Sequence, residues 1–128
     1  MLTAVQQLDY TIVLCEDMDV MKSFYRNLLP FSVESESETT LAMRAGSLVL
    51  ALRKRTRDYD GRGAGAESPG VQLAFRVPLD DVDHCHQQLV AEGVTILDPP
   101  QDQIWGHRTV YFSDPEGNVL EVYAEIAT

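Results

Sequence analysis

The chain has 128 residues, the size of one domain, and its 45% hydrophobic and 23% charged content is typical of a folded globular protein. A formal net charge of −10 argues against general nucleic-acid binding, which needs a clustered positive surface. The longest apolar runs, such as residues 48–52, are too short to span a bilayer, and no secretory signal pattern is present. Cys15 and Cys85 give neither a disulfide framework nor a metal-ligand spacing. We therefore expect a cytoplasmic protein that binds neither nucleic acid nor membrane.

The first half of the chain reads as a strand, a helix and three strands. Residues 8–14 are apolar and β-branched, which predicts a strand. Asp17 can cap a helix whose apolar residues recur at helical spacing until Pro30 ends it. Residues 31–34, 39–44 and 48–52 follow as short strands, and a turn at residues 45–47 joins the last two.

The second half repeats this order. Residues 71–77 predict a strand, Asp80 or Asp81 can cap the next helix, and Gly93 ends it. Residues 94–97, 108–112 and 119–123 predict three strands, with a strong turn signal at 114–118. We therefore predict an α+β fold of two β-α-β-β-β modules, about residues 6–52 and 71–126, in a single domain covering 1–128. The modules would form one cupped, eight-stranded mixed sheet with the helices on its outer face.

Residues 53–70 are rich in Arg, Gly, Asp and Ser and predict a linker between the modules. This segment opens with a basic run, which is a local exception to the acidic balance of the chain. The run could contact an anionic ligand or a nucleic acid, or it could be part of a solvated linker. Its members are Arg53, Lys54, Arg55 and Arg57.

The two halves can be aligned with each other by setting Gly46 against Gly117 and Cys15 against Val77. This alignment predicts one equivalent position on the first and on the last strand of each module. The four positions are Tyr10, Leu50, Gln72 and Glu121.

Three motifs resemble a known superfamily: FYRNLLPF at 24–31, WGHR at 105–108 and FSDPEGNVLE at 112–121. The chain is similar to the glyoxalase I, bleomycin-resistance and extradiol-dioxygenase proteins, also called vicinal oxygen chelate proteins. The resemblance covers nearly the whole chain outside residues 53–70. It implies a small organic ligand and a homodimer with pockets built from both chains. One such fold hosts many functions, so the activity must be argued from the site.

In metal-dependent members of this superfamily, the ligands lie on the first and last strands of the modules. Carried over to this chain, the resemblance places them at the four aligned positions. Only Glu121 is a typical ligand, because Leu50 cannot bind a metal, Tyr10 would have to ionise and Gln72 is a weak neutral donor. A catalytic metal generally needs about three good protein ligands. We therefore expect no metal and no other cofactor, with a divalent metal at Glu121 as the alternative.

Strand parity gives the residues expected around a ligand. If Phe112 lies across from Val119, then Phe112 and Arg108 share the face of Glu121, whereas a slip of one residue would reverse every side. Arg108 or Tyr10 could satisfy the buried carboxylate. Trp105 could stack at the mouth of the pocket or simply pack. The predicted ligand-binding residues are Tyr10, Leu50, Gln72, Trp105, Arg108, Phe112 and Glu121.

Two main functions compete on these residues. The first is metal-independent binding of a small drug or metabolite, which the missing metal ligands favour. The second is a lyase, isomerase or dioxygenase that uses Glu121, either with a metal or as a general base with Tyr10 as its acid. An interaction domain with an unused pocket is a third class. Glu121 is the one candidate for a catalytic role, and no other residue is assigned such a role.

Overall fold

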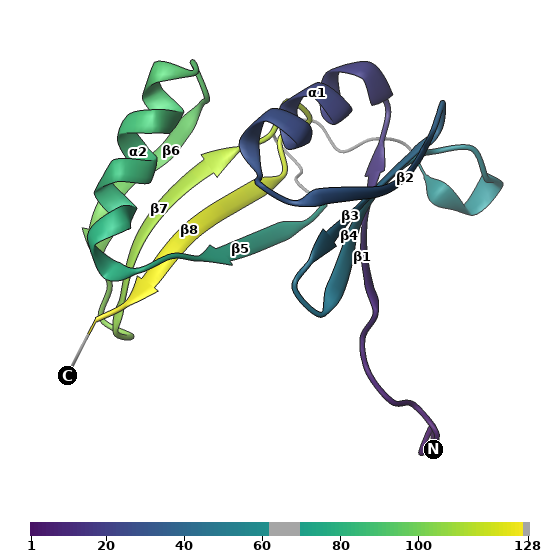
Figure 1. Ribbon diagram of the computed structural model, residues 1–128, viewed down its shortest axis with the longest axis horizontal. Helices are drawn as coiled ribbons and strands as arrows, with labels where there is room; N and C mark the ends of the chain where they lie inside the picture. Colours follow the sequence, from purple (N-terminus) through teal and green to yellow (C-terminus); the bar gives the residue numbers. More distant parts are fainter. Residues whose placement is uncertain (62–69, 127–128) are drawn as a thin grey trace. The chain divides into compact units, whose positions relative to one another are not determined.

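The computed structural model describes residues 1–61 and 70–126. The chain divides into two compact units, Met1–Gly63 and Ala64–Thr128. Both units contain a strand, a helix and three further strands in this order, with an additional short 3₁₀ helix in each (Figure 1). The strands form two four-stranded mixed sheets, in the orders β1-β4-β3-β2 and β5-β8-β7-β6. The α+β class and the two predicted β-α-β-β-β modules are confirmed.

The first unit is built around one parallel strand pair. Its elements are β1 (Tyr10–Cys15), α1 (Met18–Leu28), β2 (Ser32–Ser37), β3 (Thr40–Ala45), β4 (Leu48–Lys54) and the 3₁₀ helix η1 (Asp58–Asp60). Strand β1 pairs in parallel with β4, which requires the crossover that α1 supplies. The predicted cap of α1 is confirmed, because the Asp17 side chain accepts a hydrogen bond from the Val20 backbone N–H at 3.2 Å.

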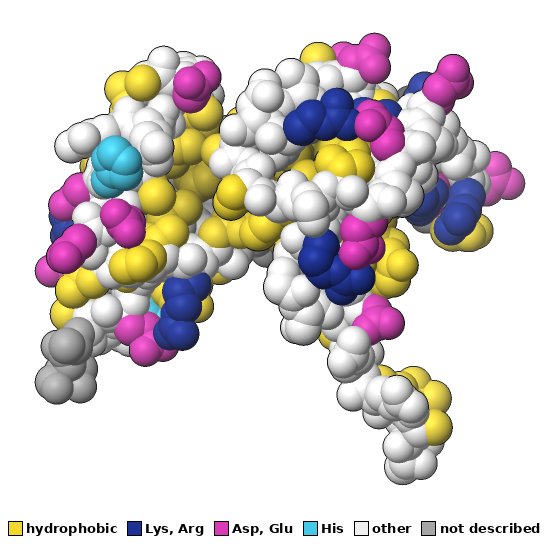
Figure 2. All heavy atoms as spheres, viewed as in Figure 1, with side chains coloured by type: hydrophobic (Ala, Val, Ile, Leu, Met, Phe, Trp, Pro, Cys, Tyr) yellow, Lys and Arg dark blue, Asp and Glu magenta, His cyan; other side chains and the backbone are white. Residues whose placement is uncertain are grey.

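One face of the first sheet packs against α1. Glu36 of β2 forms ion pairs with Lys22 and Arg26 of α1, so the face of the sheet that carries Glu36 is the face that α1 covers. Leu41 lies beside Glu36 and Leu52 beside Leu41, and both leucines are buried. Figure 2 shows oppositely charged side chains next to one another on the surface of this unit.

The predicted linker begins later than expected. Strand β4 continues through Lys54, and the buried Asp60 holds the following residues in place. Its carboxylate accepts two hydrogen bonds from Arg53, at 2.9 and 2.7 Å, and one from the backbone N–H of Thr56 and of Arg57. The bonds from Arg53, followed by that from the Arg57 N–H, hold the pKa of Asp60 well below its usual range. The remaining linker residues, 62–69, lie outside the described residues.

The second unit repeats the plan. Its elements are β5 (Gln72–Arg76), the 3₁₀ helix η2 (Leu79–Asp81), α2 (Val82–Ala91), β6 (Ile96–Asp102), β7 (His107–Ser113) and β8 (Val119–Glu125). Gly93 follows α2 with φ +73°, the left-handed conformation predicted for it. Strand β6 lies at an edge of the sheet and contains Pro99 and Pro100, which an edge strand tolerates. The sequence prediction ended this strand too early at residue 97, because prolines usually argue against a strand.

The turn between β7 and β8 is fixed by two buried side chains. The Asp114 carboxylate accepts hydrogen bonds from the backbone N–H groups of Glu116 and Asn118 and from the Asn118 amide. The Asn118 side-chain oxygen in turn accepts the N–H groups of Gly70 and Val71, immediately before β5. The turn therefore sets the β7–β8 register and also ties the start of β5 to β8.

None of the helices within residues 1–61 and 70–126 is long and apolar enough to cross a membrane.

Candidate functional site

The two faces of the second sheet have different environments. Helix α2 packs against one face, where Arg108 of β7 donates to Asp83 of the helix at 2.8 Å. Val110 and Phe112 follow Arg108 at alternate positions and are buried, with Phe112 only 1% exposed. We call the opposite face of β5, β8 and β7 the site face. Glu121 lies on the site face, in register with Ala74 on one side and with Tyr111 on the other.

Glu121 is at the centre of the site face and is 8% exposed. The side-chain amide of Gln72 donates a hydrogen bond from Nε2 to Oε1 of Glu121 at 3.3 Å. Sheet geometry explains this contact, because Gln72 lies beside Val119 in the parallel β5–β8 pair, two residues before Glu121 on the same face.

Tyr111 is the aromatic partner of Glu121. Burial raises the pKa of the Tyr111 phenol, and the negative charge of Glu121 raises this pKa further. Asp98, which lies beside Tyr111 on β6, contributes in the same direction, whereas a hydrogen bond with Thr109 has the opposite effect. The Tyr111 hydroxyl is therefore protonated at neutral pH, and its hydrogen bond to the Glu121 carboxylate raises the pKa in the same direction.

A second cluster lies further along the site face. The Tyr123 ring stacks on the His107 imidazole with their centroids 4.6 Å apart. The Arg76 guanidinium lies over the same Tyr123 ring, 5.8 Å from its centroid, and forms an ion pair with Glu125. This row of rings and charges crosses β7, β8 and β5, so it stiffens the face beside Glu121.

Two predicted ligand-binding residues lie on the face opposite Glu121, because the predicted register of β7 and β8 is wrong by one residue. Ser113, rather than Phe112, lies across from Val119, so Phe112 pairs with Leu120. The one-residue difference places Phe112 and Arg108 on the face that α2 covers. The physical reason is the turn, where Asp114 begins a side-chain-bonded loop and leaves Ser113 as the last residue of β7. Tyr111, which sequence reasoning missed, lies across from Glu121, and Ser113 takes the place across from Val119 that was predicted for Phe112.

On β4, the alignment of the two modules predicted from the sequence differs by one residue from the alignment that the strand registers give. Tyr10 lies beside Val49 as Gln72 lies beside Val119, so the first-module equivalent of Glu121 is Ala51. The predicted residue, Leu50, is on the face that α1 covers and is buried. Tyr10 is on the other face of the first sheet and is 54% exposed.

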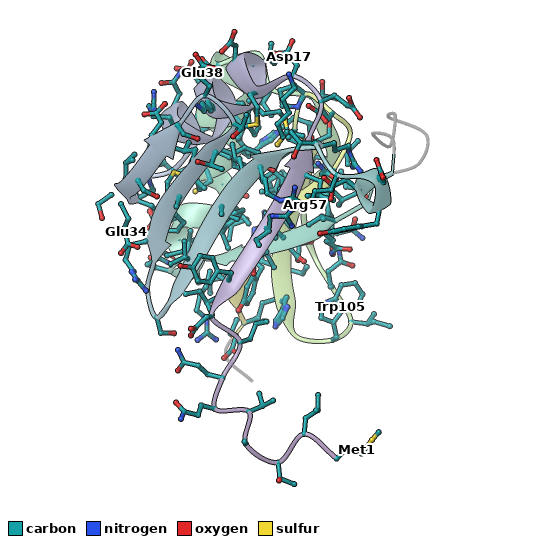
Figure 3. All side chains as sticks on the ribbon, turned by 90° about the vertical axis from the view of Figure 1, so that its right-hand side faces the viewer. Met1, Asp17, Glu34, Glu38, Arg57 and Trp105 are labelled. Atoms are coloured by element: carbon teal, nitrogen blue, oxygen red, sulfur yellow. The ribbon has the colours of Figure 1, made fainter. Side chains whose placement is uncertain are left out.

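Trp105 lies in the turn between β6 and β7 and is 58% exposed (Figure 3). The first residue of β7, His107, is already four strand positions from Tyr111, which is about 13 Å at the rise of a β-strand. The structure therefore brings Gln72 and Glu121 together but does not place Trp105 beside them.

The residues around Glu121 do not fit a catalytic metal. Within residues 1–61 and 70–126, no group of three or more His, Cys, Asp or Glu side chains could hold a metal ion. The contacts of Glu121 on the site face are the amide of Gln72 and the phenol of Tyr111. A neutral amide and a protonated phenol are poor ligands for a first-row metal.

Comparisons with known proteins show the family to which this chain belongs. Residues 7–122 match the Glyoxalase/Bleomycin resistance protein/Dioxygenase superfamily. Virulence protein STM3117 of Salmonella typhimurium is 20% identical over 92% of this chain and 83% of its own length. Metallothiol transferase FosB of Lysinibacillus sphaericus is 24% identical over 93% of this chain and 82% of its own length.

Solved structures show the same fold at low sequence identity. A glyoxalase-related enzyme from Fulvimarina pelagi is 22% identical, with a TM-score of 0.79 over 94% of this chain and 89% of that protein. Lactoylglutathione lyase from Agrobacterium tumefaciens is 19% identical, with a TM-score of 0.74 over 94% of each chain. With the match over residues 7–122, these likenesses confirm the resemblance seen in the sequence motifs. The chain belongs to the glyoxalase/bleomycin resistance protein/dioxygenase superfamily.

Proposed function

We propose that this protein binds a small organic molecule on the site face of the second unit, without a resident metal. The observation that carries the proposal is the environment of Glu121. Its carboxylate contacts the Gln72 amide and the Tyr111 phenol on the face of the sheet opposite α2. These groups favour hydrogen bonding to an organic ligand over coordination of a metal.

Each of the three side chains has a hydrogen-bonding role to offer. Glu121 can accept further hydrogen bonds on its remaining lone pairs, the Tyr111 hydroxyl oxygen can accept while its proton is held by Glu121, and the Gln72 amide oxygen can accept while its nitrogen is held by Glu121. A few fixed polar groups beside aromatic rings are typical of small-ligand sites. The Tyr123 ring, two positions along β8 from Glu121 and stacked on His107, supplies such an aromatic surface.

An enzyme of the lyase, isomerase or dioxygenase type is the second candidate. Two of the similar proteins are named as a metallothiol transferase and a lactoylglutathione lyase, which favours an enzymatic function. In a metal-free reaction Glu121 would act as the general base. Tyr111, rather than the predicted Tyr10, is the tyrosine beside it in the second unit and would act as the acid.

Metal analysis tests the proposal directly. We would purify the protein without added metal, measure Ni, Zn, Mn and Fe per chain by elemental analysis, and titrate each metal by calorimetry. The proposal expects no stoichiometric metal and no tight uptake. The matched variants are Glu121→Gln and Glu125→Gln, two glutamates of β8 of which the second is paired with Arg76.

A near-stoichiometric metal that Glu121→Gln loses and Glu125→Gln keeps would overturn the proposal and favour the metal enzyme. The predicted homodimer stays a prediction, which sedimentation equilibrium on the same protein would check.

A further inference from the structure

The partners of Glu121 donate hydrogen bonds to it but supply no counter-charge. Both are neutral, since one is the Gln72 amide and the other the protonated Tyr111 phenol. Among the described residues, none of the ion pairs formed by lysines or arginines includes Glu121. A buried carboxylate without a counter-charge is costly.

The arginine on the same face is already occupied. Arg76 forms its ion pair with Glu125 and lies over the Tyr123 ring. The other arginine of this sheet, Arg108, lies on the opposite face with Asp83 and Asp102. The two cations of the sheet are therefore paired with other carboxylates, and the negative charge of Glu121 remains for a ligand to meet.

We propose that the ligand is a compact organic cation, such as a primary ammonium or an amidinium, that donates N–H to Glu121 while its apolar part lies against Tyr111. This inference rests on the function proposed above and names the class of its ligand. A charged donor forms a shorter and stronger hydrogen bond to a carboxylate than a neutral donor does. A cation next to the ring of Tyr111 gains further from the negative face of the aromatic system.

The same arrangement disfavours anions. A carboxylate or phosphate ligand at this position would meet Glu121 directly and Asp98 beyond Tyr111, both negative. Tyr111 would therefore be a specificity-determining residue, because it lies between Glu121 and Asp98 in the strand register. The excess of acidic over basic residues in the chain would also favour the approach of a cation.

Three probes of one shape and different charge test the proposal: benzylamine, benzyl alcohol and benzoate. Binding would be measured by NMR shift titration of the full-length protein at neutral pH and low salt. We expect benzylamine, which is a cation under these conditions, to bind more tightly than benzyl alcohol, and benzoate to bind least. Glu121→Gln should weaken benzylamine about ten- to hundredfold and change benzyl alcohol little.

Two further variants complete the design. Tyr111→Phe keeps the ring and should keep the preference for the cation, whereas Tyr111→Ala should reduce it. Glu125→Gln removes a charge from the same strand and should leave benzylamine binding within about twofold of the parent, because that glutamate is exposed and paired with Arg76.

The outcomes distinguish a failure of the cation proposal from a failure of the proposed function. If all three probes bind equally, if none binds, or if Glu121→Gln leaves benzylamine unaffected, the cation proposal is overturned. Preferred binding of benzyl alcohol or benzoate would overturn it too, while leaving small-molecule binding in place. A stoichiometric metal at Glu121 would instead overturn the function on which the inference rests. Should Glu121→Gln fail to fold, the ranking of the three probes on the parent protein still decides the ligand class.

Discussion

Asn118 connects the turn before β8 to the start of β5, so we expect Asn118→Ala to destabilise the protein strongly. The side chain makes three hydrogen bonds: its amide donates to Asp114 at 2.8 Å, and its oxygen accepts the N–H of Val71 at 3.2 Å and of Gly70 at 3.3 Å. A bond to a charged group contributes about 2 kcal/mol and each longer backbone bond about 0.5 kcal/mol, which gives a loss of about 3 kcal/mol.

Equilibrium unfolding in urea, followed by circular dichroism, measures this loss. With a slope of about 1.5 kcal/mol/M, the midpoint should fall by about 2 M. Asn27→Ala is the matched control, because Asn27 is exposed on α1 and its amide contacts only the Ser23 hydroxyl at 3.5 Å. The control should shift the unfolding free energy by less than about 0.5 kcal/mol. If Asn118→Ala behaves like the control, the reasoning that this side chain ties β5 to β8 is refuted.

Three other predictions follow from the fold and the site. Phe112→Ala should lower the unfolding free energy by about 4 kcal/mol, because the ring is buried on the face that α2 covers. The same variant should leave the affinity for benzylamine unchanged. Weaker benzylamine binding without a loss of stability would contradict the assignment of Phe112 to that face. The pKa of Asp60 is lowered in the folded protein, so the stabilisation it gives is present at neutral pH and is lost as the pH falls below about 4. The stability difference between the parent and Asp60→Asn should therefore shrink in urea titrations at decreasing pH, and a constant difference would argue against the Arg53 contact. In a spectrophotometric pH titration, Tyr111→Phe should remove the signal of a tyrosine whose pKa lies above the ordinary tyrosine pKa of about 10. If the variant instead lost a tyrosine that ionises at a lower pH than the others, the effect of Glu121 on the Tyr111 pKa would be contradicted.

Local sequence signals predicted the elements well, because they depend on neighbouring residues alone. The capping side chain of Asp17 and the left-handed Gly93 mark helix ends in the structure as they do in the sequence. The repeated order of elements gave the two modules for the same reason. It also gave Gln72 and Glu121 as two of the four aligned positions, and the structure brings these two side chains to 3.3 Å.

Sheet register was the part that could not be predicted from composition or periodicity. A slip of one residue reverses every side chain of a strand, and the slip depends on how many residues a turn uses. The Asp114 side chain determines that number through bonds to Glu116 and Asn118, and the sequence pattern does not reveal those bonds. As a result Phe112 and Arg108 were assigned to the site, and Tyr111 between them was missed.

One edge of each sheet resists intermolecular strand pairing. Strand β2 is exposed along its whole length, has a bulge between Val33 and Ser35, and carries the charged Glu34 and Glu36. Strand β6 has two irregularities and contains Pro99 and Pro100, which have no backbone N–H to offer. Charges, bulges and prolines are the features by which proteins prevent open edges from joining those of other molecules. Strand addition between copies of this chain is therefore disfavoured at β2 and β6.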